Sequence, residues 1–539
     1  MKTRTRLMMI ALLSSLLLAV LVMLPRLLDP RFGLLDDGAT IETVQTIAGG
    51  NWITWDIQGG RFRPGYWAFW LMLYLVGGKN PLIFFLGNTV LLAGISVLLT
   101  ALIGLWTRRW GAGLLASAIL LTSPPSAELF YTLSKGEGLQ VFWILVALLM
   151  ITLFSRRRDR GVLATVLAAL AMLAACLSKE TGVIVLPLSF AAAAINFLQK
   201  RRTFRWQISN PYLQAASAAL ASSAVFLIWR TMVLRKTAQD AAGYAGNYAI
   251  EIRTFLVSAY RWAGLLLSDF PYLLLLPLGA LLVWKRMRTG SKQVLLLAIL
   301  WTAAWVAVFF PWDGITVYFE FPAAVGIAVF AALILAEVIP TLRESRSGRR
   351  IVISGAIAGI LLLLGASIGN ALTDGIIQLS TDAVNWEAVE AAAALAPEDG
   401  LLLVNIQDSN EYIYELPIHL RIFHDREDLA VDIVRLDEFP PESPLPITLL
   451  APYMQGAPVL TVRTGVVEPY IGIWDDSLQE RLGEDVQTVA AMETANTLFS
   501  FKLPQLLCGF VNAETYCRGE PRALDLLDYS YGWRIYQLP

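Results

Sequence analysis

Charged residues, cysteine and histidine are all scarce in this chain of 539 residues. Only 16% of the residues are charged and 56% are hydrophobic, whereas a soluble globular protein averages about 25% charged residues. Three cysteines exclude a disulfide-rich secreted scaffold, and two histidines without a Cys-x-x-Cys pair provide no zinc motif. The apolar and aromatic content excludes intrinsic disorder. A mean hydropathy of +0.58 therefore predicts a polytopic membrane protein.

The net charge of −1 conceals two oppositely charged parts of the chain. Residues 1–370 hold 33 Lys and Arg against 16 Asp and Glu, a net charge of +17. Residues 371–539 hold 9 against 27, a net charge of −18. Two compartments explain this division better than one mixed surface, and no basic face is left for a nucleic-acid partner. We expect a membrane region over 1–370 and an acidic domain over 371–539.

Apolar segments recur throughout the first part, and a bilayer-spanning helix needs about 20 such residues. The first segment is interpreted as an uncleaved anchor, because no clear small-residue cleavage site follows it. Several of the others are short or interrupted. The eleven expected spans are residues 7–28, 81–106, 111–123, 137–154, 161–177, 181–198, 212–232, 255–283, 293–310, 321–340 and 351–370.

Basic clusters fall in alternate connections between these segments. Because positive charge is retained on the cytoplasmic side, the N-terminus and those connections are predicted to be cytoplasmic. The other connections, and the tail after the eleventh span, are predicted to be extracytoplasmic. A bacterial plasma membrane fits this composition best. The outer connections are residues 29–80, 124–136, 178–180, 233–254 and 311–320.

The acidic tail has the pattern of an α/β domain. A helix is expected over 382–396, with short strands over 401–406, 446–450 and 459–462. Cys508 and Cys517 would lie on the oxidising side, where a disulfide between them is expected. His419 and His424 are interpreted as surface residues rather than metal ligands.

The first outer loop, residues 29–80, carries adjacent carboxylates at Asp36 and Asp37. Its Trp-rich stretches are expected to form interfacial helices along the membrane surface. A partly desolvated carboxylate at a bilayer edge has a raised proton affinity and can accept a proton from a hydroxyl group. The alternative is a solvated loop carboxylate, or a cap for a helix over the following segment. The residues alone leave both interpretations open.

Arg61 and Arg63 follow in the same loop and lead into an aromatic run. The guanidinium fork suits the oxygens of a phosphate at a lipid headgroup. An ordinary interfacial belt of arginine and aromatic residues is the alternative.

Two further outer segments place charge at the bilayer edge, where it is costly unless paired or used. One contains Glu128, Lys135 and Glu137, and the alternative to a functional role is a salt bridge from Lys135 to either glutamate. The other is the tight turn with Lys179 and Glu180, whose alternative role is to cap helix ends.

Several common motifs are missing from the sequence. There is no Walker loop, no G-x-S-x-G elbow and no H-E-x-x-H pair. ATP-driven transport and the serine and zinc hydrolase templates therefore have no support.

Five short sequences occur in order: LLDDGATI, GRFRPGYW, KNPLIFFLGNTVLL, SPPSAELFYTLSKGEGL and LSKETGVIVLPL. This series resembles the GT-C superfamily of membrane glycosyltransferases over roughly residues 7–200. It is most similar to the protein O-mannosyltransferase-like branch, which includes the tetratricopeptide-repeat transmembrane enzymes. The tail has no 34-residue period and so lacks those repeats. The later segment VYFEFPAAVG lacks the arginine and serine that relatives often carry there.

The resemblance implies a GT-C-like fold and transfer of a sugar from a polyprenyl-phosphate donor to a hydroxyl of a protein, lipid or glycan. It places the catalytic base at Asp36 or Asp37, of which we favour Asp36, and a second acidic position at Glu128. We predict no metal and no other cofactor. The cations that we infer for neutralising the departing phosphate are Arg61, Arg63, Lys135 and Lys179.

Two other classes of function compete with this prediction. A transporter or flippase for a lipid or solute would typically show repeated halves and broken helices that meet at the midplane, and we detect no such halves. A non-catalytic assembly factor would tolerate changes at Asp36 and Asp37 but would lose function when the tail is deleted.

Overall fold

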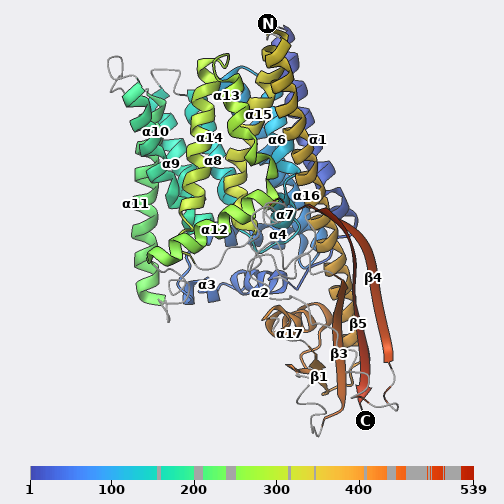
Figure 1. Ribbon diagram of the computed structural model, residues 1–539. Helices are drawn as coiled ribbons and strands as arrows, with labels where there is room; N and C mark the ends of the chain where they lie inside the picture. Colours follow the sequence, from blue (N-terminus) through green and yellow to red (C-terminus); the bar gives the residue numbers. More distant parts are fainter. Residues whose placement is uncertain are drawn as a thin grey trace.

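The computed structural model describes most of the chain. The described residues are 2–34, 36–154, 160–199, 210–237, 250–312, 317–344, 347–405, 410–433, 445–456, 482, 486, 488–501, 503 and 524–538. They form a bundle of helices with a β-sheet domain at one end (Figure 1).

Long apolar helices make up the bundle because their sequences leave no polar face at helical spacing. Nine helical segments among the described residues are long and apolar enough to cross a membrane, and α6 is a shorter apolar helix. The helices are α1 (Lys2–Leu28), α5 (Pro81–Thr107), α6 (Trp110–Leu121), α7 (Pro124–Phe130), α8 (Glu137–Phe154), α9 (Gly161–Ser178), η2 (Glu180–Ile184), α10 (Val185–Gln199), α11 (Pro211–Thr237), α12 (Ile252–Asp269), η4 (Pro271–Leu274), α13 (Leu276–Val283), α14 (Thr289–Ala307), η5 (Val317–Glu320), α15 (Phe321–Glu344) and α16 (Ser347–Leu395).

One expected span, residues 255–283, is wrong as a single helix. The chain forms α12, then the short 3-10 helix η4, then α13. Pro271 has no backbone N–H and disfavours a helical conformation in Phe270 before it, so the helix stops there. Ile252 and Leu256 on α12 are largely exposed, and α12 lies across the lower end of the bundle (Figure 1).

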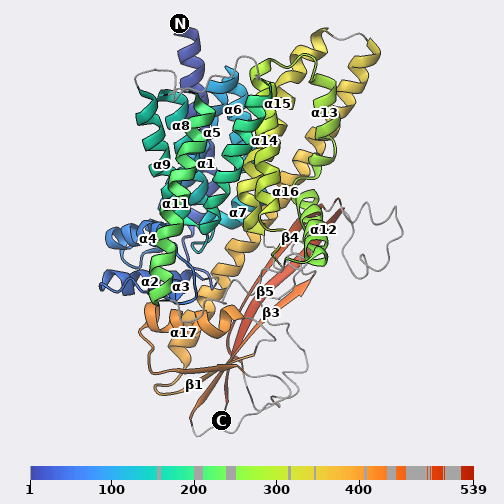
Figure 2. The same ribbon diagram turned by 90° about the vertical axis from the view of Figure 1, so that its left-hand side faces the viewer.

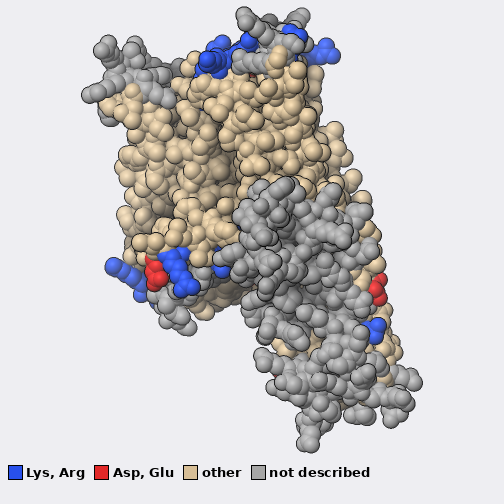
Figure 3. Space-filling view, in the orientation of Figure 1, with Lys and Arg blue, Asp and Glu red and all other residues tan. Residues whose placement is uncertain are grey.

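The two ends of the bundle differ in charge. The N-terminus lies at the end opposite the sheet domain (Figure 1). On the face that Figure 3 shows, Lys and Arg side chains gather at the N-terminal end, and a band almost free of charged side chains separates it from the other end. Such a band matches the hydrocarbon layer of a bilayer. That the basic end faces the cytoplasm stays a prediction.

The last helix of the bundle, α16, joins the bundle to the sheet domain without interruption. The helix expected over 382–396 is therefore the end of a 49-residue helix that begins at Ser347 and ends at Leu395. Pro397 and Gly400 follow its end. At the level of the first outer loop, Asp382 of α16 and Arg26 of α1 form a buried ion pair of 2.5 Å. This contact connects the first helix to the last.

The C-terminal domain is a mixed five-stranded sheet in the order β2-β1-β3-β5-β4. β1 pairs in parallel with β2 and β3, whereas β5 pairs antiparallel with β3 and β4. Leu402, Leu416 and Ile535 belong to its core. The strands predicted over 401–406 and 446–450 correspond to β1 and β3, while residues 459–462, Cys508 and Cys517 lie outside the described residues. The elements are β1 (Leu401–Val404), α17 (Asn410–His424), β2 (Ala430–Ile433), β3 (Ile447–Gly456), β4 (Thr488–Phe501) and β5 (Leu524–Leu538).

Three helices of the first outer loop lie between the bundle and this domain. They are α2 (Asp37–Ala48), α3 (Trp55–Gln58) and α4 (Pro64–Gly77). Trp52 and Trp55 are about half exposed, at 47% and 50%, as expected for indole rings at a membrane surface. α2 lies next to α17 of the C-terminal domain in both ribbon views (Figures 1 and 2).

Candidate active site

Asp36 lies at the turn that starts α2. Its φ of 63° is in the left-handed region, which aspartate adopts more readily than most residues. The carboxylate is 37% exposed, and its Oδ2 lies 3.6 Å from Nζ of the nearly buried Lys135. The hydroxyl of Tyr414, from α17, donates a hydrogen bond to the other oxygen, Oδ1. The carboxylate is thus contacted by Lys135 and Tyr414 and is still accessible to solvent.

The charges around Asp36 favour its ionised form. Burial alone would raise its pKa, but Lys135, the hydrogen bond from Tyr414 and Arg61 outweigh burial, so the pKa is lowered from its ordinary value. Asp36 is therefore a carboxylate at neutral pH and can accept a proton.

Asp37, by contrast, is 1% exposed and is bound to the backbone. Its two oxygens accept hydrogen bonds from the amides of Gly33 (2.9 Å) and Leu133 (2.8 Å). Burial, together with the charge of Asp382, raises its pKa to about 8. Asp37 therefore connects the first outer loop to the second. Of the two adjacent carboxylates, Asp36 is the exposed one.

Arg61 and Arg63 converge on one buried carboxylate, Asp56. Oδ2 of Asp56 accepts from Nη2 of Arg63 at 2.5 Å and from the indole of Trp67 at 3.0 Å. Oδ1 accepts from Nη1 of Arg61 at 3.5 Å. Two guanidinium groups thus share one negative charge, and Arg63 makes the shorter hydrogen bond to it.

The two lysines meet on the ring of Tyr318. Nζ of Lys135 is 4.5 Å and Nζ of Lys179 is 5.5 Å from its centroid. Lys179 forms an ion pair with Glu137. Burial lowers the pKa of Lys179 to about 8, and Glu137 limits that fall.

Two ion pairs of the described residues were not among the alternatives that the sequence offered. Lys135 contacts Asp36, and Lys179 contacts Glu137. Glu180 instead forms a 2.7 Å ion pair with Arg230 and accepts from the amide of Phe62. The ion pairs therefore connect loops that are distant in sequence.

The contacts above connect these residues expected in the site: Asp36, Asp37, Arg61, Arg63, Lys135 and Lys179. Glu128, also expected there, lies half-buried on α7, and its backbone carbonyl accepts from the hydroxyl of Thr132. Asp56, Glu137, Tyr318 and Tyr414 belong to the same cluster. None of these four residues was predicted as a site residue. Asp56 lies in the first outer loop with Asp36 and Arg61, so its position in the sequence offered a signal.

The C-terminal domain places a buried Glu-His pair against α2. Glu415 accepts from the amides of Gly38 (2.8 Å) and Ala39 (2.9 Å), and its Oε2 lies 3.3 Å from Nε2 of His419. The interpretation of His419 as a surface residue is wrong: its side chain is 1% exposed, and burial lowers its pKa to about 4. His424 is half-buried.

Glu415→Gln is expected to flatten the pH dependence of stability. Burial, with the charges of Asp36 and Glu42, raises the pKa of Glu415 to about 8 against two backbone hydrogen bonds that lower it. A carboxyl whose pKa is raised in the folded state stabilises the fold at low pH. This contribution is lost as the pH rises from the pKa of the unfolded state through the folded value of about 8. Between pH 6.5 and 8 the free energy of unfolding should therefore fall less steeply with pH in the variant than in wild type. The difference in slope should reach up to about 1.4 kcal/mol per pH unit.

Thermal unfolding in detergent measures this difference. The variant should also be less stable overall, because glutamine offers one acceptor oxygen to two amides, so the slope is the diagnostic quantity. Glu387→Gln, at a side chain that is 40% exposed, is the matched control and should keep the wild-type slope. Equal slopes for Glu415→Gln and wild type would contradict the prediction.

No group of three or more histidine, cysteine, aspartate or glutamate residues suited to a metal ion occurs in the part of the chain that the structure describes. The cations of the cluster are instead arginine and lysine.

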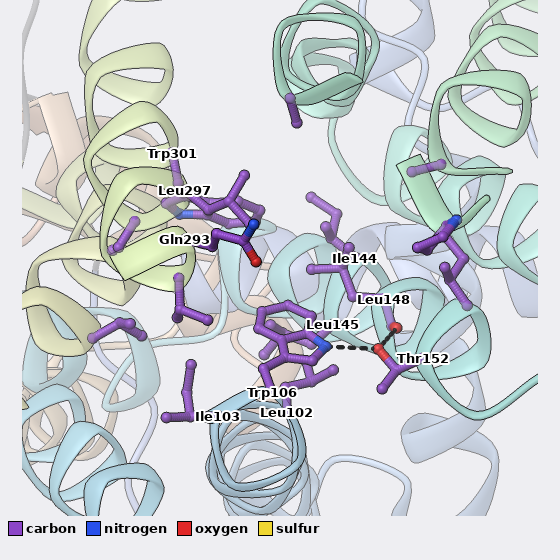
Figure 4. A pocket seen from close by; sticks show the side chains of 18 of the residues that line it. Leu102, Ile103, Trp106, Ile144, Leu145, Leu148, Thr152, Gln293, Leu297 and Trp301 are labelled. Atoms are coloured by element: carbon purple, nitrogen blue, oxygen red, sulfur yellow. Dashed lines mark hydrogen bonds between the residues drawn. The ribbon is translucent and has the colours of Figure 1, made fainter. Parts of the chain in front are cut away.

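An apolar cavity of about 440 Å³ lies inside the helical bundle. Its lining comes from α5, α8, α9, α10, α11, α14 and α15 and is mostly aliphatic, with Trp106 and Trp301 facing into it (Figure 4). Trp106 donates to the hydroxyl of Thr152, which satisfies its polar atom. The cavity extends to Val185 on α10 and Val325 on α15, shortly after Lys179 and Tyr318 in the chain.

No protein-family model matches the sequence, and no curated protein sequence matches it. Among solved structures the chain is similar to ArnT from Cupriavidus metallidurans, both bound to undecaprenyl phosphate and in the apo state. Identity is 14% in each case, and each alignment covers 83% of this chain and 93% of that one. The TM-scores are 0.45 and 0.43. At these values neither structure assigns a family or an activity to the chain.

Proposed function

We propose that the protein is a membrane glycosyltransferase that moves a sugar from a polyprenyl-phosphate donor to a hydroxyl acceptor on the extracytoplasmic side. One observation carries the proposal: the carboxylate of Asp36 lies 3.6 Å from Lys135, beside Arg61, Arg63 and Lys179 at the edge of the helical bundle. A base beside several phosphate-binding groups is the arrangement that transfer from a lipid phosphate requires.

In the proposed reaction Asp36 accepts the proton of the acceptor hydroxyl as that oxygen attacks the anomeric carbon. The bond from this carbon to the phosphate oxygen breaks, and its electron pair leaves with the polyprenyl phosphate. Attack opposite the leaving group inverts the anomeric carbon. In this proposal Arg61, Lys135 and Lys179 neutralise the added charge, while Arg63 holds Asp56.

The apolar cavity supports a lipid-linked donor. Hydrocarbon chains bind in apolar surroundings, with about 0.8 kcal/mol for each buried methylene. A donor whose chain enters between the helices would present its phosphate at the end of the bundle where the cation cluster lies. The motif resemblance to the O-mannosyltransferase-like branch of the GT-C superfamily points to the same donor class. The identity of the sugar and of the acceptor stays outside this proposal.

The choice of donor tests the proposal. Purified protein in detergent would be supplied with hexoses on polyprenyl phosphate or on nucleotide diphosphates, together with a mixture of membrane lipids and peptides as acceptors. We expect mass spectrometry to show free polyprenyl phosphate and no consumption of the nucleotide sugars. Consumption of nucleotide sugars alone would contradict the proposal, and uptake of an unchanged solute into proteoliposomes would favour a transporter.

Leu297→Trp should weaken the use of long-chain donors selectively. Leu297 lines the cavity, and an indole there would exclude about two or three methylenes, which costs ~2 kcal/mol, or about 30-fold in the KM of the donor. A donor with a short chain should be unaffected. Ile299→Trp on the same helix is the matched control, since Ile299 is 43% exposed on its outside. Equal effects on long and short donors would contradict a chain in this cavity.

A further inference from the structure

α17 of the C-terminal domain holds the segment that carries Asp36 at two points. The hydroxyl of Tyr414 donates to the carboxylate of Asp36. The carboxyl of the adjacent Glu415 accepts from the amides of Gly38 and Ala39, at the start of α2. One turn of α17 therefore contacts both the side chain of Asp36 and the backbone that follows it.

This contact is closely packed. A Cβ atom added at Gly38 would lie 2.6 Å from Oε2 of Glu415 and 2.6 Å from Cδ2 of His419, closer than atoms approach without displacement. Phe423 of α17 lies 5.2 Å from the ring of Phe32 in the first outer loop. The domain is thus packed against the loop through a continuous interface.

Polar contacts extend the interface away from Asp36. Arg421 forms an ion pair with Glu42 on the exposed side of α2. Nζ of Lys79, after α4, donates to the carbonyl of Ile422. These contacts join the same elements as Tyr414 does, but they do not involve Asp36.

The backbone of Asp36 needs such support. A non-glycine residue in the left-handed region carries strain, which persists only where the surrounding contacts fix the conformation. The left-handed turn directs the side chain of Asp36 away from the buried Asp37, toward Lys135 and Tyr414. Without Tyr414 the described contacts of this carboxylate come from the membrane part alone.

We propose that α17 completes the candidate active site and that Tyr414 is a positioning residue, whose hydroxyl orients the Asp36 carboxylate. The inference rests on the proposed function, in which Asp36 is the base. It assigns the acidic C-terminal domain a part in the reaction, acting through Asp36.

The charged and titratable groups that face Asp36 come from several elements. They are Lys135 from the second outer loop, Arg61 and Tyr66 from the first, and Tyr414 and Glu415 from α17. A Tyr414→Phe variant keeps Lys135 and Arg61 beside the carboxylate of Asp36. It lacks only the hydrogen bond from the phenol hydroxyl. A hydrogen bond to an ionised group is about twice as strong as a neutral one, so its loss should raise the pKa of Asp36 by about one unit.

Carbodiimide labelling of Asp36 tests this without relying on activity. Carbodiimide reacts with the protonated carboxyl, and mass spectrometry of the Asp36 peptide gives its rate in the full chain in detergent at pH 5.5. We expect about tenfold faster labelling in Tyr414→Phe than in wild type. Labelling of the exposed Asp425 in the same sample provides the reference rate. Arg421→Gln, which weakens the same interface without touching Asp36, should label like wild type.

Each other outcome overturns the inference. Equal labelling in Tyr414→Phe and wild type would show that the phenol does not control the carboxylate. Equal acceleration in Arg421→Gln would show that loosening of the domain, rather than the hydroxyl, is responsible. In sugar transfer, the acid limb of the Tyr414→Phe pH profile should move up by about one pH unit, which a purely structural role would not cause.

Failure of the proposed function has a different signature. If Asp36→Asn transfers sugar at the wild-type rate, Asp36 is not the base, whatever the labelling of Tyr414→Phe shows. If Asp36→Asn is inactive and the Tyr414→Phe variant keeps the wild-type labelling rate and acid limb, only the positioning role fails.

Discussion

Asp36→Asn is expected to reduce sugar transfer by about 10²–10⁴-fold, the usual contribution of a positioned general base. The amide cannot accept the proton of an acceptor hydroxyl. Asparagine tolerates the left-handed conformation as aspartate does, so the φ of 63° at this position can be kept. The variant should therefore fold normally and bind donor, and initial rates at saturating donor measure the loss.

Asp425→Asn is the matched control for this variant. Asp425 also has a left-handed backbone, with φ of 52°, and its side chain is exposed on the C-terminal domain. The same chemical change at the same conformation should leave transfer unchanged. A fully active Asp36→Asn variant would place the base elsewhere, with Glu128 as the next candidate.

Asp56→Ala is expected to destabilise the protein by about 3–5 kcal/mol, the usual effect of removing one partner of a buried ion pair. The side chain of Asp56 is fully buried and accepts from Arg61, Arg63 and Trp67. Without it the two guanidinium groups would lose the carboxylate that they share. Unfolding by SDS titration in mixed micelles measures the change, and donor binding should weaken as the arginines move apart.

Asp29→Ala is the comparison for a solvent-exposed pair in the same loop. Asp29 pairs with Arg31 at 2.8 Å, but its side chain is 50% exposed, and such pairs contribute about 0–1 kcal/mol. Similar losses in Asp29→Ala and Asp56→Ala would contradict the buried arrangement around Asp56.

Much of the helical bundle is predictable from the sequence because a long apolar run has few alternatives to a buried or membrane helix. The failures have local causes. Residues 255–283 are apolar enough for one span, but Pro271 divides them into α12, η4 and α13. The helix at 382–396 was predicted separately because its Ala-rich sequence differs from the apolar run before it, yet the two are continuous as α16.

The candidate site is less predictable from one sequence. The order of motifs and the predicted sidedness drew attention to Asp36, Arg61, Lys135 and Lys179, because charge at a bilayer edge is unusual. Which carboxylate pairs with which cation depends on loop packing, and the pairs of Lys135 with Asp36 and of Lys179 with Glu137 were not among those that the sequence offered.

The contribution of α17 had no signal at all in the sequence. Tyr414 and Asp36 are 378 residues apart, and Tyr414 lies in a helix of mixed composition. The sequence predicts His419 and His424 to be surface residues, but His419 is 1% exposed. Its burial depends on the docking of α17 against α2, which only the three-dimensional arrangement reveals.

The most direct test of the central claim is mass spectrometry of the lipid products formed from polyprenyl-phosphate hexose by wild type and Asp36→Asn, side by side in detergent with an acceptor mixture. We predict free polyprenyl phosphate with wild type and at least about 100-fold less with the variant. Equal release of polyprenyl phosphate by the two proteins would contradict the assignment of Asp36 as the base.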